Sequence, residues 1–170
     1  MLNAITDTFL IDSVFPNRRS IGVLFDTVHR SQDAFEGFEA IRNYFPNKTD
    51  VVIFSQCYNP PIMLPPVALY HMKSLNNFKG SIVSTSLLCI SDSLRIHSID
   101  KKIWYIYNLG ECSLYSNSDL VHLLEDPNVI KICRCERYKK WCDNINPNND
   151  VLDDIMPSLD INKVEEIIYG

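Results

Sequence analysis

Five short runs of apolar residues recur along the chain, and helix-patterned or looping stretches separate them. The runs do not alternate apolar with polar residues, which is typical of strands that are covered on both faces. The pattern therefore predicts a parallel sheet that lies between two layers of helices. The five predicted strands are IGVLF at 21–25, VVIF at 51–54, SIVS at 81–84, IWYIY at 103–107 and VIKIC at 129–133.

The stretches between these runs carry apolar residues at helical spacing. Ser31 is the predicted N-cap of a helix that ends before Pro46, and Asp160 is the predicted N-cap of a final amphipathic helix. Four prolines exclude a helix interior from residues 56–66, because proline lacks the amide donor. Further helices are predicted at 68–78, 84–94, 117–124 and 136–145.

Together these elements predict one α/β domain over residues 1–170. We expect a three-layer, doubly wound, Rossmann-like fold with a mainly parallel five-stranded sheet. Because crossovers between parallel strands are almost always right-handed, the expected strand order is 3-2-1-4-5. Residues 1–19 are expected to form an N-terminal arm, which could add an edge strand, and residues 146–170 a C-terminal loop and helix.

Composition narrows the function further. The net charge of −5 opposes nonspecific binding to duplex nucleic acid, which requires clustered Lys and Arg. No apolar run approaches the length of a membrane span, so we expect no membrane association and a cytoplasmic location. The six cysteines lack the spacing of a disulfide scaffold and are expected to be reduced.

The loop after the first predicted strand reads DTVHRS, without the glycines that a dinucleotide site or a P-loop needs. We therefore expect no nucleotide cofactor of the standard kind, and no other cofactor is indicated. Cys133, Cys135 and Cys142 supply three thiols at poor spacing for zinc, so no metal site is predicted.

Ligands of doubly wound folds bind beyond the carboxyl ends of the strands, so polar residues at those positions are the candidate site. Asp26 and His29 are weak candidates for acid–base catalysis, since histidine titrates nearest to neutral pH; both residues are also commonplace in solvent-facing loops. Arg134 and Arg137 lie at the start of a helix, where amides already favour anions. The predicted ligand-binding residues are Thr27, Ser55, Gln56, Tyr58, Ser84, Thr85, Asn108, Arg134 and Arg137.

Several stretches of residues 48–170 resemble small, uncharacterised proteins of tailed phages, notably those of cyanobacteria, and the N-terminal Rossmann-like half of GT-B glycosyltransferases. The stretches are VVIFSQCYNPPIMLPPVALYHMKSLNNFKGSIVSTSL, KKIWYIYNL, VIKICRCERYKKWCDN and SLDINKVEEII. The resemblance implies a domain that binds an acceptor, because the sugar nucleotide is held chiefly by the other half of such enzymes. It carries no catalytic residue over to this chain.

Three functions remain open at this point. The first is a phage accessory protein, a lone glycosyltransferase-like domain that binds an acceptor or a partner macromolecule in the host cytoplasm. Any transferase activity would then need a partner subunit. The second is a free-standing enzyme that acts on a nucleotide or a sugar phosphate, with Asp26 and His29 as acid and base. The third is a virion or assembly component.

Overall fold

A computed structural model describes residues 19–29, 31–44, 49–57, 59–61 and 63–170, and these residues form one open sheet in which every pairing is parallel. The strand order is β3-β2-β1-β4-β5-β6-β7. The strands are β1 (Arg19–Phe25), β2 (Thr49–Ser55), β3 (Leu69–His71), β4 (Gly80–Ser84), β5 (Ile99–Ile106), β6 (Val129–Cys133) and β7 (Val151–Ile155).

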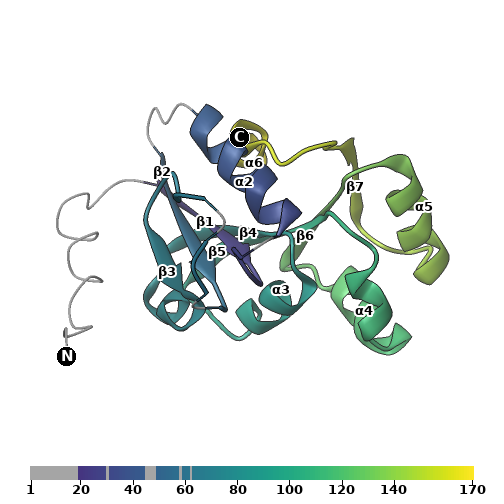
Figure 1. The fold of residues 1–170 in the computed structure, drawn as a ribbon. Helices are drawn as coiled ribbons and strands as arrows, with labels where there is room; N and C mark the ends of the chain where they lie inside the picture. The colour runs from purple at the N-terminus through teal and green to yellow at the C-terminus, as the bar shows by residue number, and fades with distance from the viewer. Residues whose placement is uncertain (1–18, 30, 45–48, 58, 62) are drawn as a thin grey trace.

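Helices cover both faces of the sheet (Figure 1). On one face lie α2 (Gln32–Asn43) and α6 (Ile161–Tyr169), and on the other lie α3 (Leu87–Ser93), α4 (Asn117–Glu125) and α5 (Glu136–Ile145). Two short 3₁₀ helices complete the described elements, η1 (Met72–Asn77) and η2 (Glu111–Leu114). Among the described residues, no helix is long and apolar enough to cross a bilayer.

The five predicted strands are all present as β1, β2, β4, β5 and β6, so the prediction of a parallel α/β sheet is confirmed. The count of five was wrong, because β3 and β7 add one strand at each end of the sheet. The predicted helix over 68–78 is instead β3 followed by η1; Leu69 pairs with Ile53 of β2. The possible N-terminal edge strand falls within residues 1–18, outside the described residues.

The observed strand order differs from the predicted order in the position of one strand. The segment at 81–84, predicted as the outer strand beyond β2, is β4 and lies on the other side of β1. The short strand β3 takes the outer position, so the seven strands in chain order read 3-2-1-4-5-6-7. The chain therefore leaves β1 in one direction and β4 in the other, which makes the gap between β1 and β4 the topological switch point.

Alternate residues of each central strand face two separate cores. Val23 and Phe25 pack with α2 and α6, whereas Leu24 and its neighbour Phe54 pack with α3 and η1. This alternation explains why the strands read as continuous apolar runs: each residue is buried, whichever face it occupies.

Helix α2 packs unusually close to β1. An ideal Cβ built on Gly37 would lie 2.4 Å from Cζ of Phe25, so the helix backbone itself rests on the aromatic ring. Phe38 then meets the same ring edge-on, with the ring centroids 6.0 Å apart. Only glycine allows this approach at position 37. The contact determines the position of the first turn of α2 relative to β1.

Edge strand β7 carries two outward carboxylates. Its Asp153 and Asp154 are exposed, and they pair with Lys139 of α5 and Lys163 of α6 respectively. The sequence analysis expected a C-terminal loop and helix over residues 146–170, so the strand formed by VLDDI was not predicted. Among the described residues β7 pairs only with β6, and an edge strand of this kind tolerates charged side chains.

Strand β6 buries a lysine. The side chain of Lys131 is 0% exposed, and its ammonium donates hydrogen bonds to the backbone oxygen of Asp126 and to the carboxylate of Asp150. A buried charge requires such partners, because an isolated ammonium in an apolar core is strongly destabilising. The Asp150 contact therefore joins the start of β7 to the middle of β6.

We predict that Asp150→Ala lowers the free energy of unfolding by about 1–3 kcal/mol, because the buried Lys131 ammonium loses its only charged partner among the described residues. Asp150→Asn, which keeps an oxygen acceptor, is expected to cost less. Asp153→Asn is the matched control on the same strand; its pair with Lys139 lies in water, so stability stays nearly unchanged. Urea unfolding measures all three, and equal losses for Asp150→Ala and Asp153→Asn would contradict the prediction.

Candidate functional site

The carboxyl edge of the sheet, where β1, β2, β4, β5 and β6 end at residues 25, 55, 84, 106 and 133, holds most of the predicted site residues. Helix α2 begins there on one face, and α3 begins there on the other (Figure 1). The residues nearest the switch point follow β1 and β4 and form the first turn of α2.

A half-buried carboxylate lies between these elements. Asp33, in the first turn of α2, accepts a hydrogen bond of 2.7 Å from Oγ1 of Thr85, which directly follows β4. The Ser31 hydroxyl also donates to Asp33, and the same hydroxyl oxygen caps the helix by accepting from the amide of Ala34. One side chain thus connects the helix that follows β1 to the end of β4.

The environment of Asp33 disfavours its charged form. Burial is the main cause that raises the pKa of this carboxyl above its ordinary value, and the nearby charge of Asp26 acts in the same direction. Hydrogen bonds from the Thr85 hydroxyl and from backbone amides lower the pKa, but they do not offset the effect of burial. Asp26 itself is exposed at the end of β1.

This arrangement has a direct chemical consequence. In doubly wound folds the amides at the start of the helix after β1 ordinarily receive a phosphate. Here the Asp33 carboxylate lies at that helix start, and Asp26 adds a second negative charge. A phosphate at this helix start would therefore meet the negative charges of Asp33 and Asp26.

The predicted serines, Ser55 and Ser84, make hydrogen bonds to the backbone. Oγ of Ser84 donates to the carbonyls of Leu24 and Ser86, at 3.3 and 2.9 Å. Oγ of Ser55 lies 3.4 Å from the carbonyl of Asp26. Both serines are buried, so these hydroxyls hold the ends of neighbouring strands together.

Arg134 is also engaged within the chain. Its guanidinium stacks over the ring of Tyr107 at 4.4 Å from the centroid, and Nε donates to the carbonyl of Pro157 at 3.1 Å. Glu36 of α2 lies 3.6 Å from Arg134, which makes a half-exposed ion pair. Arg134 thus connects α2, the residue after β5 and the segment before α6.

The β1–α2 loop orients a histidine. Nδ1 of His29 lies 2.9 Å from the carbonyl of Pro60, so Nδ1 carries the hydrogen and donates it. The backbone amide of His29 donates to Oγ1 of Thr27. Tyr58, the next predicted residue of the neighbouring loop, lies outside the described residues.

Two further predicted residues, Asn108 and Arg137, are exposed. The side chain of Asn108 accepts from the amide of Gly110 and so shapes the turn after β5. Arg137 is exposed on α5. Among the residues that the structure describes, no group of three or more His, Cys, Asp or Glu side chains could hold a metal ion.

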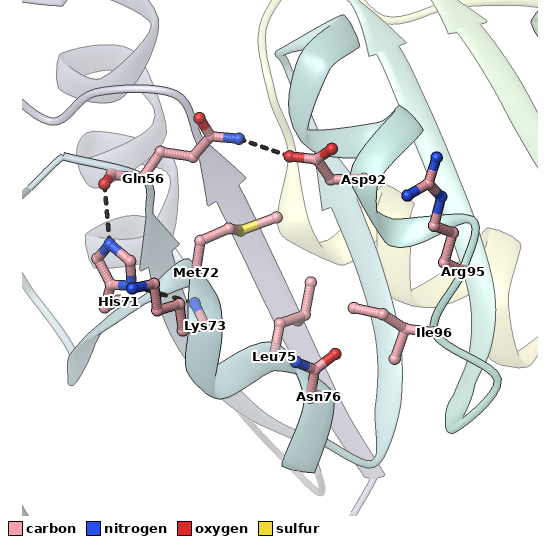
Figure 2. Close-up of a pocket in the computed structure, with 9 residues that line it drawn as sticks. All are labelled: Gln56, His71, Met72, Lys73, Leu75, Asn76, Asp92, Arg95 and Ile96. Carbon is pink, nitrogen blue, oxygen red and sulfur yellow. Dashed lines mark hydrogen bonds between the residues drawn. The ribbon is translucent and has the colours of Figure 1, made fainter.

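A pocket of about 440 Å³ lies beside this edge, between η1 and α3 (Figure 2). Of the predicted residues only Gln56 lines it, and Nε2 of Gln56 donates to Asp92 of α3 at 3.0 Å. This η1–α3 pocket is lined by Gln56, His71, Met72, Lys73, Leu75, Asn76, Asp92, Arg95 and Ile96.

The sequence prediction did not include Asp33 and Glu36, because it considered residues at the strand ends and in the loops after them, and in the first helix it considered only the N-cap and the apolar positions. A signal for Asp33 was present: Ser31 as N-cap places Asp33 in the first turn of the helix, at the carboxyl edge. No sequence signal pointed to the pocket, since it depends on how η1 and α3 are spaced over the sheet. Comparison of the chain with protein-family models, curated proteins and solved structures finds no match.

We predict that Asp33→Asn raises the free energy of unfolding at pH 7. The pKa of Asp33 is raised in the folded protein, so its ionised form costs stability above that pKa. The cost disappears as the pH falls below 3.8, the ordinary value, where the carboxyl is protonated in both states. In urea-unfolding measurements, the difference in the free energy of unfolding between Asp33→Asn and the wild type therefore decreases as the pH is lowered toward 3.8.

Asp119→Asn is the matched control. Asp119 also lies in the first turn of a helix and accepts from its N-cap, Ser116, but it is exposed. Removing its charge is expected to cost about 0.3–1 kcal/mol of helix-dipole stabilisation at pH 7. If Asp33→Asn destabilises the protein as Asp119→Asn does, the burial cost assigned to Asp33 is wrong.

Proposed function

We propose that this chain is a phage-encoded accessory protein, a glycosyltransferase-like binding domain that receives the hydroxyl groups of a carbohydrate acceptor at the carboxyl edge of its sheet. In this proposal the domain binds and orients, and a partner subunit supplies the sugar nucleotide and the transfer chemistry. The sequence resemblance to the N-terminal half of GT-B enzymes motivates the choice of ligand.

The observation that supports it most is the Asp33–Thr85 contact at the switch point. The contact places a half-buried carboxylate where a nucleotide-binding fold would receive phosphate, and Asp26 and Glu36 add further acceptor oxygens at the same edge. Sugar hydroxyls are neutral donors, and a hydrogen bond to a carboxylate is roughly twice as strong as one between neutral groups. The edge therefore suits a neutral polyol better than a nucleotide.

A free-standing enzyme is the second candidate, and one observation favours it. The contact between Nδ1 of His29 and Pro60 leaves Nε2 as the unprotonated nitrogen of the neutral ring, which is the arrangement of a general base. A phosphate-bearing substrate would still meet the charges of Asp26 and Asp33, which is why we rank this function second.

The test is an NMR titration of the protein with maltotriose, UDP and UDP-glucose. We expect maltotriose to shift the amide resonances of residues 31–37 and 84–87, and UDP to leave them unchanged. Asp33→Asn should weaken maltotriose binding about tenfold, because a charge-assisted hydrogen bond is lost. Asp119→Asn, the same change on the opposite face of the sheet, should leave the affinity unchanged.

Two outcomes would overturn this proposal. Shifts at the same amides with UDP or UDP-glucose, but none with maltotriose, would favour the enzyme on a nucleotide or sugar phosphate. Binding of maltotriose that Asp33→Asn and Asp119→Asn leave equally intact would place the sugar elsewhere on the molecule.

A further inference from the structure

The η1–α3 pocket exists because one helical layer is incomplete. The connection from β3 to β4 crosses this face of the sheet as η1, which spans only six residues. Over the β2 end of the sheet, α3 and η1 therefore leave a hollow that a longer crossover helix would fill (Figure 2). Its volume of about 440 Å³ lies within the range of small-molecule sites.

The floor of the pocket is apolar. Leu75 of η1 is fully buried, and Met72 and Ile96 are half-buried. Figure 2 shows the Met72 side chain extending from η1 toward α3, with Leu75 and Ile96 facing each other below it. Such a floor favours the apolar part of a ligand, since burying apolar surface stabilises a complex by about 25 cal/mol per Å².

The walls carry two cations. Lys73 belongs to η1 and Arg95 follows α3, and both are exposed. No ion pair to either of them is found among the described residues. The one acid that lines the pocket, Asp92, accepts a hydrogen bond from Gln56 across its mouth. The pocket therefore has a net positive charge of its own, in contrast to the acidic carboxyl edge.

Hydrogen bonds hold the polar residues at the start of η1 in place before any ligand binds. Nδ1 of His71 accepts from the amide of Lys73 at 3.1 Å, and Nε2 lies 3.0 Å from the carbonyl of Gln56, which can only accept. His71 is therefore held as the neutral ring with its hydrogen on Nε2. Because both ring nitrogens are used, His71 orients the start of η1. Residues that are already ordered in this way lose little conformational entropy when a ligand binds.

We propose that the η1–α3 pocket binds a small amphiphilic anion, a carboxylate or phosphate monoester carried on a compact apolar ring or chain. The apolar body lies on Met72, Leu75 and Ile96. The anionic group faces Lys73 and Arg95, and the amides of Gln56 and Asn76 supply further hydrogen-bond donors. This site is separate from the proposed acceptor site, since neither Asp33 nor Thr85 lines it and its net charge is positive.

The experiment is a ¹⁵N NMR titration with phenyl phosphate, phenylacetate and the neutral benzyl alcohol. We expect the two anions to shift the amides of Lys73, Asn76, Arg95 and Ile96 at millimolar concentration, and benzyl alcohol to bind more weakly. Lys73→Gln and Arg95→Gln should each lower the affinity for the two anions about three- to fivefold, as expected for an exposed ion pair. The affinity for benzyl alcohol should not change. Lys140→Gln, which removes an exposed cation of α5, is the matched control and should change nothing.

The relative affinities of phenyl phosphate and phenylacetate decide which anionic group the pocket prefers. The proposal is overturned if none of the three probes shifts these amides, or if benzyl alcohol binds as tightly as the anions. It is also overturned if Lys140→Gln lowers the affinity for the anions as much as the two pocket variants do. Maltotriose binding at the carboxyl edge does not depend on any of these outcomes.

Discussion

The direct packing of the α2 backbone on the Phe25 ring determines how the carboxyl edge is built. At Gly37 the helix approaches β1 more closely than any side chain would permit. Because α2 is a rigid element of twelve residues, this contact also places its first turn, and with it Asp33 within hydrogen-bond distance of Thr85. The ion pair between Glu36 and Arg134 follows from the same placement. A glycine in mid-helix weakens the helix by itself, so its position here reflects packing.

The two faces of the sheet differ in how completely they are covered, and the chemistry of the molecule follows that difference. On the α2 and α6 face the helices lie close to the strands, and polar groups at the edge pair mainly with one another. On the other face η1 replaces a full helix, and a positively charged hollow results. An acidic region at the carboxyl edge and a cationic pocket on one face thus occur in the same domain, and neither Asp26 nor Asp33 lines the pocket.

The sequence predicted those elements whose signal is local. Runs such as VVIF and IWYIY are buried on both faces and were assigned correctly. The strand β3 was missed because Leu69–His71 is short and half-buried and lies within a helix-like spacing of apolar residues. At the candidate site, Ser55, Ser84 and Arg134 lie at or directly after the ends of strands, as the strand pattern predicted, but the sequence did not indicate which groups they contact. Whether Arg134 faces a ligand or Tyr107 depends on a contact between residues 27 positions apart.

The two carboxylates on β7 bear on how the molecule behaves in a crowded solution. An unpaired strand at the margin of a sheet is a template onto which another chain can add by main-chain hydrogen bonding. A chain that paired with β7 would bring its own side chains beside Asp153 and Asp154, which are exposed. Charged side chains on an edge strand discourage such pairing, so the acidic half of VLDDI opposes end-to-end growth of the sheet into fibres.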